Sequence, residues 1–280
     1  MDYAYLNGNF LPLSDVSIGI CDRSIFFGDG VYDAMVGKMG KIYMLREHLA
    51  RFRKNLSALS LEVNYTDEEL CDILCRLSEK VGGGEQFFYI QANRSREGRI
   101  HSAYGCHTAN LFAYVRHFTL PDCNRFLSLV TVEDTRYALC HIKTVNLLPN
   151  VLASTYAEEM GADEAIFVKD GVVRECSHSN IAILSDGVLL THPLDCHILP
   201  GIMRGALLEM ARRMGIVAME RAFSSDALFR AEGVFVTSTT RRVALANSID
   251  GIELAPPSSL AKQLHFLLNK DFFENMAKNT

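Results

Sequence analysis

The sequence predicts a mixed α/β protein of the α+β class, folded as two domains. Strand-like and helix-like segments follow one another along the whole chain. Its 280 residues are enough for one large domain, or for two of about 120 to 150 residues each. The polar stretch "TLPDCN" begins at Thr119 and has the composition of a linker. We therefore expect the domains to be residues 1–120 and 121–280.

The first half combines strands with two helices. Asn7 and Gly8 predict a hairpin turn within "YLNGNFLPL", and "GVYDAMVGKMGKIYML" has the pattern of two strands. "REHLARFRKNLSALSL" has apolar residues at helical spacing, and a second helix begins at a capping box from Thr66 to Glu69. This helix ends at "VGGGEQ", after which the strands "QFFYIQANR" and "NLFAYVRHF" flank an arginine-rich loop.

The second half begins with a predicted strand that runs into Lys143. The helix "VLASTYAEEMG" follows and stops at Gly161. Two hairpins then turn at residues 170–171 and 186–187, where the dipeptide is Asp-Gly. A helix follows "LPG" from Ile202 to Met214, the strand "GVFVTSTT" comes later, and a last helix begins after two prolines.

Composition and charge favour a soluble, cytoplasmic protein that binds a small molecule. The net charge of −5 and the lack of a basic stripe argue against nucleic acid or an anionic membrane as partner. The N-terminal "MDYAYLNGNF" has no export pattern, and no apolar run has the length of a membrane span. We therefore expect the eight scattered cysteines to be reduced thiols. The cysteines and histidines lack the spacing typical of metal ligands, so no metal site is predicted.

Lys143 stands in "ALCHIKTVNLLPN", where the flanking residues predict burial. A lysine at the end of an element can extend its ammonium to solvent. Burial instead disfavours the ammonium, and the neutral amine is a nucleophile that forms a Schiff base with an aldehyde. If the aldehyde is pyridoxal 5'-phosphate, the chain must also supply an acid for the ring nitrogen and an anion site for the phosphate.

Each of these needs has a candidate, and each candidate also has a plain structural interpretation. Glu175 lies where a hairpin strand enters a polar bend, and it is either the acid for the ring nitrogen or a solvated glutamate. Phosphate candidates are the backbone N–H groups at the start of a helix, two hydroxyls after a strand, and one helix arginine. These are Ile202 and Met203, Ser238 and Thr239, and Arg51.

Further candidate binding residues lie in two places. In an extended segment Arg99 and His101 project to the same side and could hold one carboxylate, but taken alone they are better explained as a solvated basic loop. Tyr32 is a candidate hydroxyl donor in "GDGVYD". That stretch is not a phosphate loop, because Asp29 would repel an anion.

The joint pattern resembles the fold-type-IV pyridoxal-phosphate enzymes, the class IV aminotransferases, over nearly the whole chain. The matching segments, in order, are "FGDGVYD", "EHLARF", "RIHS", "HIKTVNLLPNVLA", "VRECSHSNIAIL", "ILPGIMR" and "FVTSTT". Within that family the chain is most similar to the D-amino-acid aminotransferases. The resemblance implies a smaller N-terminal α/β sandwich and a larger C-terminal, cofactor-binding α/β pseudo-barrel.

The resemblance also implies a role for each candidate residue. Lys143 would form the Schiff base with pyridoxal 5'-phosphate, and Glu175 would meet the pyridine nitrogen. Arg51, Ile202, Met203, Ser238 and Thr239 would bind the phosphate. Tyr32, Arg99 and His101 would bind the substrate carboxylate, the last two reaching in from the other subunit of a homodimer.

The implied reaction is transamination between a D-amino acid, such as D-alanine, D-glutamate or D-aspartate, and pyruvate or 2-oxoglutarate. L-branched-chain aminotransferases and 4-amino-4-deoxychorismate lyases share the lysine and the glutamate, and a non-catalytic pyridoxal-phosphate-binding protein is a further alternative. The chain departs from the family pattern at Met203, where threonine is common, and at Cys176 and His178, which replace small residues. A bulky imidazole at His178 is expected to narrow the pocket.

Overall fold

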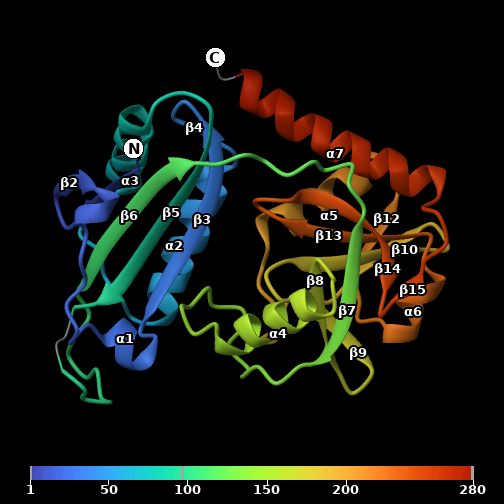
Figure 1. Cartoon of the computed structure of the whole chain (residues 1–280), viewed down its shortest axis with the longest axis horizontal. Helices are drawn as coiled ribbons and strands as arrows, with labels where there is room; N and C mark the ends of the chain where they lie inside the picture. The colour runs from blue at the N-terminus through green and yellow to red at the C-terminus, as the bar shows by residue number, and fades with distance from the viewer. Residues whose placement is uncertain (1, 96–97, 279–280) are drawn as a thin grey trace. The chain divides into compact units, whose positions relative to one another are not determined.

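The computed structural model describes residues 2–95 and 98–278, and its contacts divide the chain into two compact units (Figure 1). Unit 1 runs to Leu120 and also takes in Ile142–Asn146 and the chain from Asn275 onward. Unit 2 comprises Pro121–His141 and Leu147–Glu274. Each unit contains one β-sheet with helices, which confirms the mixed α/β class.

Unit 1 is built on a six-stranded antiparallel sheet in the order β2-β1-β6-β5-β3-β4. Its strands are β1 (Tyr3–Leu6), β2 (Asn9–Pro12), β3 (Gly30–Lys38), β4 (Lys41–Ile42), β5 (Glu85–Arg94) and β6 (Ala109–His117). The hairpin predicted at Asn7 and Gly8 is confirmed, and both residues have a positive φ as such a turn requires.

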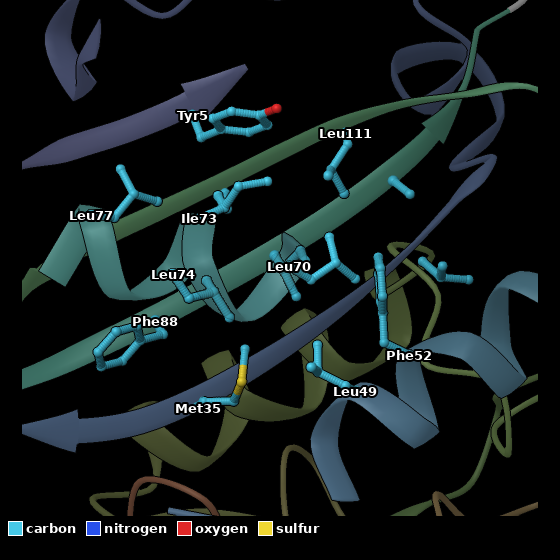
Figure 2. Packing of buried hydrophobic residues seen from close by; sticks show 14 of the residues in the cluster. Tyr5, Met35, Leu49, Phe52, Leu70, Ile73, Leu74, Leu77, Phe88 and Leu111 are labelled. Carbon is cyan, nitrogen blue, oxygen red and sulfur yellow. The ribbon is translucent and has the colours of Figure 1, made fainter. Parts of the chain in front are cut away.

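Two helices, α2 (Leu45–Ala58) and α3 (Asp67–Val81), cover one face of this sheet (Figure 1). Figure 2 shows Leu49 and Phe52 of α2 in one cluster with Leu74 of α3 and with Met35 and Phe88 of the sheet. The predicted capping box at the start of α3 is present. A short turn η1 (Leu13–Asp15) and helix α1 (Arg23–Phe27) precede β3, and neither was predicted.

Unit 2 contains a nine-stranded mixed sheet in the order β12-β11-β10-β13-β14-β7-β8-β9, with β15 paired to β14. The strands are β7 (Leu127–Glu133), β8 (Glu164–Lys169), β9 (Val172–Cys176), β10 (Asn180–Ser185), β11 (Val188–Thr191), β12 (Val217–Glu220), β13 (Gly233–Ser238), β14 (Arg242–Ile249) and β15 (Ile252–Glu253). β9 lies against β10 although the two strands are far apart in the sheet order, so the sheet curls as a pseudo-barrel does.

The helices of unit 2 agree largely with the sequence pattern. They are α4 (Leu148–Glu159), α5 (Ile202–Arg213), α6 (Ser225–Arg230) and α7 (Ser259–Lys278), of which only the short α6 was not predicted. Both Asp-Gly turns, at residues 170–171 and 186–187, have a positive φ at each position and close the predicted hairpins. α5 packs against β13 and β14.

The predicted strand into Lys143 is wrong. β7 ends at Glu133, and residues 134–147 form turns and a single β-bridge. The apolar run here does not reflect burial within a sheet, because Ile142–Asn146 crosses to unit 1 and pairs with its β3. No helix in the described part of the chain is long and apolar enough to span a membrane.

Replacing Phe52 by alanine should destabilise unit 1 by about 3–5 kcal/mol, because the side chain is fully buried between α2 and the sheet. Urea unfolding of the variant measures this change. Phe266→Ala is the matched control, since that phenylalanine is 62% exposed on α7. Equal effects of the two substitutions would contradict the packing described above.

Candidate active site

Lys143 lies on a short segment bonded to the first residues of β3. The N–H of Tyr32 donates to the carbonyl of Lys143 at 3.0 Å, and the N–H of Val145 donates to Gly30 at 3.3 Å. Asn146 donates its side-chain N–H to the carbonyl of Gly28 at 2.8 Å. These bonds fix the backbone of the lysine relative to the strand that carries Tyr32.

The structure brings Lys143 and Tyr32 together. The Nζ atom of Lys143 lies 4.4 Å from the centre of the Tyr32 ring, within the range of a cation–π contact. The Tyr32 ring stacks on Tyr89 of β5, with ring centres 5.4 Å apart. Lys143 is half-buried in the single chain rather than buried as the sequence predicted, because its segment lies at a strand edge and not inside a core.

A fully buried carboxylate, Asp33, holds the predicted phosphate residue Arg51. Nε of Arg51 donates to Oδ2 of Asp33 and Nη2 donates to Oδ1, each at 2.8 Å. Nδ1 of His48 lies 2.8 Å from Oδ1 of the same carboxylate. Arg51 therefore has a fixed guanidinium orientation, which is set by two residues to which the sequence analysis assigned no role.

Burial and the ion pair together determine which residues of this cluster are charged. Burial opposes ionisation of Asp33, but the charge of Arg51 and the bonds from His48 and Arg51 outweigh it and hold the pKa of Asp33 well below its usual range. Burial also lowers the pKa of His48; the bond to Asp33 and its charge oppose this effect, and the charges of Arg51 and Lys143 add to it. His48 is therefore neutral near pH 7 and donates its Nδ1–H to Asp33.

In unit 2, Glu175 is buried at the end of β9 with donors on both carboxylate oxygens. Arg136 donates to Oε1. Oε2 accepts from the side chain of Asn180 at 3.0 Å and from the N–H of Leu199 at 2.9 Å. A carboxylate held by a guanidinium and two N–H groups is stabilised in its ionised form.

Arg136 is a functional candidate that the sequence did not reveal. Its guanidinium donates twice to Asp134, each time at 2.9 Å, donates to the carbonyl of His197 at 3.0 Å, and lies 4.1 Å above the ring of Phe167. Burial opposes its charge, but the bonds to Asp134 and the charge of Glu175 raise the pKa of Arg136. A buried glutamate needs a cation, yet nothing in the spacing of "EDTRYALC" identifies this arginine as the partner.

The phosphate candidates of unit 2 gather around Asn180. Ile202 and Met203 are the first two residues of α5, whose N-terminus no side chain caps. Asn180 donates to the carbonyl of Leu199 as well as to Glu175, and a Cβ on Gly201 would lie 1.9 Å from its Oδ1. Only glycine permits this approach, which ties the start of α5 to the glutamate.

The hydroxyl candidates lie beside the same asparagine. Asn180 of β10 pairs with Thr237 of β13, and Ser238 and Thr239 come directly after that residue. The Ser238 hydroxyl accepts from the N–H of Arg241 at 3.2 Å. Unit 2 thus brings Glu175, the N-terminus of α5 and these two hydroxyl residues into one bonded frame.

Arg99 and His101 are exposed on the loop after β5. They do not lie on the extended segment that the sequence predicted, because bends occupy this part of the loop. The His101 ring lies 5.0 Å from the ring of Phe27. Among the described residues, no hydrogen bond or ring contact joins Arg99 or His101 to Tyr32.

The residues that depart from the family pattern differ in their surroundings. Cys176 belongs to the hydrophobic core of unit 2, and burial raises its thiol pKa well above the usual value. Met203 is also buried. His178 is half-exposed, and its Nδ1 lies 3.1 Å from Oε1 of the buried Glu164. The other oxygen of Glu164, Oε2, accepts from the Ser179 hydroxyl. Cys176 therefore belongs to the core of the unit.

Comparison with known proteins places these features in one family. A sequence model described as "Amino-transferase class IV" matches residues 30–249. The chain is 34% identical to a D-alanine aminotransferase of Bacillus licheniformis over 97% of its own length and 98% of that protein. It is 35% identical to a D-alanine aminotransferase of Staphylococcus aureus, over 90% of each chain.

Solved structures agree in fold at lower identity. A branched-chain aminotransferase of Thermoproteus uzoniensis superposes with a TM-score of 0.89 at 22% identity, covering 98% of this chain and 95% of that one. A fold IV transaminase of Curtobacterium pusillum gives a TM-score of 0.83 at 23% identity, covering 96% and 99%. The family model spans most of the sequence, and a curated relative is 34% identical over nearly the whole chain. The chain therefore belongs to the class IV aminotransferases.

Proposed function

We propose that the protein transfers an amino group between a D-amino acid, of the D-alanine, D-glutamate or D-aspartate type, and pyruvate or 2-oxoglutarate. The observation that carries this proposal is the likeness, over nearly its whole length, to proteins named D-alanine aminotransferase. The branched-chain aminotransferases share the fold but only 21–22% of the sequence, so they support the architecture and not the substrate. A lyase acting on aminodeoxychorismate remains the other candidate within the family.

The residues of both units suit pyridoxal 5'-phosphate as the cofactor. Its protonated ring withdraws electrons from the substrate α-carbon when the cofactor is bound. Glu175 holds the proton on the ring nitrogen, and Arg136 and Asn180 keep its carboxylate ionised and oriented. Lys143 would hold the cofactor through its side-chain amine, and the same amine would carry the proton to and from the substrate α-carbon.

Each unit supplies candidate groups for binding the phosphate. Arg51 provides a guanidinium oriented by Asp33, and the N–H groups of Ile202 and Met203 provide the N-terminus of α5. The hydroxyls of Ser238 and Thr239 complete the set. We assign the two units to an N-terminal domain, residues 1–120, and a cofactor-binding domain, residues 121–280, with Ile142–Asn146 of the latter paired to β3 of the former.

Tyr32, Arg99 and His101 bind the substrate carboxylate and thereby select its hand. The α-hydrogen must point to Lys143, so exchanging a D- for an L-amino acid exchanges the places of the carboxylate and the side chain. These hydrogen-bond donors would lose their partner if an alkyl group took the place of the carboxylate. The side that carries these three residues therefore favours the D-enantiomer.

We further propose a homodimer in the cytoplasm. Helix α4 carries a row of exposed apolar side chains, which a second copy of the chain would cover. They are Leu148, Val151, Leu152 and Tyr156, followed by Met160. A dimer would also let Arg99 and His101 act in the site of the other subunit. The cytoplasm is proposed from the reduced cysteines that the sequence predicts.

The function is tested by half-reactions with D-alanine, L-leucine and L-valine, followed through the absorbance of the bound cofactor. D-alanine should react fastest and release pyruvate, because its carboxylate occupies the arginine side of the site. Borohydride reduction should fix the cofactor on the peptide that contains Lys143. Faster reaction of the L-substrates, or a label on Lys169, would refute the corresponding assignment.

The shared site is tested by mixing two inactive variants, one lacking the Lys143 amine and one lacking the Arg99 guanidinium. Mixed dimers contain one site with both residues intact if Arg99 serves the opposite subunit, so about a quarter to a half of the activity should return. Two variants of Lys143 mixed together are the control. If mixed dimers form, as shown by a tagged copy, and no activity returns, each chain carries its own complete site.

Replacing Asp33 by asparagine should weaken binding of pyridoxal 5'-phosphate about 10- to 100-fold, because Arg51 loses the carboxylate that orients it. Binding of pyridoxal, which lacks the phosphate, should change less than about twofold. Asp67→Asn is the control, since Asp67 pairs with Arg53 at the surface. An equal loss of affinity for pyridoxal 5'-phosphate and pyridoxal would show that Asp33 stabilises the fold without contributing to phosphate binding.

A further inference from the structure

We propose that Asp29 is a positioning residue for the loop that carries Arg99 and His101, acting through Arg23 and Arg94. The inference rests on the proposed function, in which Arg99 and His101 bind the substrate carboxylate. It gives a role to the "GDG" stretch, where an acidic residue stands between two glycines. It also explains how exposed side chains on a long loop can be presented in a defined place.

One carboxylate oxygen of Asp29 accepts hydrogen bonds from two arginines. Nε of Arg23 donates to Oδ2 at 2.7 Å, and Nε of Arg94 donates to the same atom at 3.0 Å. The backbone adds a third bond, from the N–H of Arg94 to the carbonyl of Asp29 at 3.1 Å. The side chain of Asp29 is 14% exposed and both arginine side chains are less so, hence their charges depend on this carboxylate for compensation.

Arg23 holds the middle of the loop. Its two terminal nitrogens donate to the carbonyls of Ile100 and His101, the second at 3.1 Å. Its guanidinium lies 4.7 Å from the centre of the Phe27 ring, against which the His101 ring also rests. Because the bonds reach the carbonyls on either side of the His101 Cα atom, they fix the direction in which the His101 side chain leaves the backbone.

Arg94 holds the base of the same loop. Its guanidinium donates to the carbonyl of Cys106, where the loop returns, and to the carbonyl of Leu59 at 2.6 Å. The N–H of Ser95 donates to the carbonyl of Thr108 at 2.9 Å and closes the two ends. Asp29 thus couples the middle of the loop to its base through a single oxygen atom.

The side chains that hold the loop are not those that bind the substrate. Arg23 and Arg94 are buried and their donors are directed at backbone carbonyls, whereas Arg99 and His101 are exposed. A loop ordered before the substrate arrives does not lose conformational freedom on binding. Loss of Asp29 should therefore weaken substrate binding while leaving the groups that act on the cofactor unchanged.

The test compares Asp29→Asn and Arg23→Gln with Arg53→Gln in the holoenzyme. Arg53 is a matched control because it also joins a carboxylate, that of Asp67, to a backbone carbonyl, that of Tyr65, but holds a different segment. In the half-reaction with D-alanine, the half-saturating concentration should rise about tenfold in both loop variants, while the saturating rate stays within about threefold. Cofactor content and thermal stability show whether each variant has folded normally.

Hydrogen exchange provides a readout that needs no substrate. The amides of Ile100 and Cys106, which are bonded within the loop, should exchange faster in Asp29→Asn and should be unchanged in Arg53→Gln. Unchanged exchange, or faster exchange with unaltered D-alanine kinetics, overturns the inference. A wild-type holoenzyme that does not convert D-alanine refutes the proposed function instead, and the exchange result still decides whether Asp29 holds the loop.

Discussion

A carboxylate that is largely shielded from solvent and paired with a guanidinium recurs at three places in the candidate site and the loop beside it. Removing either charge from water is costly, and the cost is recovered only when the geometry is close and the remaining donors are satisfied. Asp33 meets this condition with Arg51, Asp29 with Arg23 and Arg94, and Glu175 with Arg136. Each pair leaves one member with a single permitted orientation, which is what a binding group requires.

These pairs differ in which partner serves the ligand. In the Asp33 pair the arginine is the candidate binding group and the carboxylate orients it. In the Glu175 pair the carboxylate is the candidate and Arg136 orients it, with Asp134 holding the arginine from the other side. A substitution of the orienting partner should thus weaken binding of the ligand, although that residue does not contact the ligand.

Local signals in the sequence account for most of the elements, and long-range contacts account for what was missed. The capping box before α3 and the Asp-Gly turns are decided within a few residues, so their patterns suffice. Helix α1 has only five residues and begins at the cap of Asp22, too short for a periodic pattern. The strand predicted into Lys143 fails because an apolar run cannot reveal that its partner is β3, more than a hundred residues earlier.

The site shows the same division. Lys143, Glu175 and Arg51 stand in motifs that the resemblance identifies, and Asp33 ends another of these motifs, but no motif states which residues pair with one another. Arg136 is 39 residues from Glu175, and Asp33 is 18 residues from Arg51 on a different kind of element. Such pairs exist only after the strands and helices have met, so neither spacing nor residue type could have predicted them.

Contacts of an asparagine with a glycine give each unit its fixed frame. In unit 1 the side chain of Asn146 fills the space that a Cβ on Gly28 would need, and it bonds the carbonyl of that glycine. In unit 2 Asn180 stands in the same relation to Gly201 while bonding Glu175. The first contact fixes the segment of Lys143, and the second fixes the acid relative to the start of α5.

A side chain at either glycine would force the asparagine away, and with it the group that the asparagine holds. Gly28 carries a further constraint, because its φ of +60° is one that other residues adopt at a cost. The glycines of "FGDGVYD" and "ILPGIMR" are therefore explained by close approach of a side-chain amide and not by contact with a phosphate. The lysine and the acid are in this way set by separate frames, one in each unit, so each can be disturbed without disturbing the other.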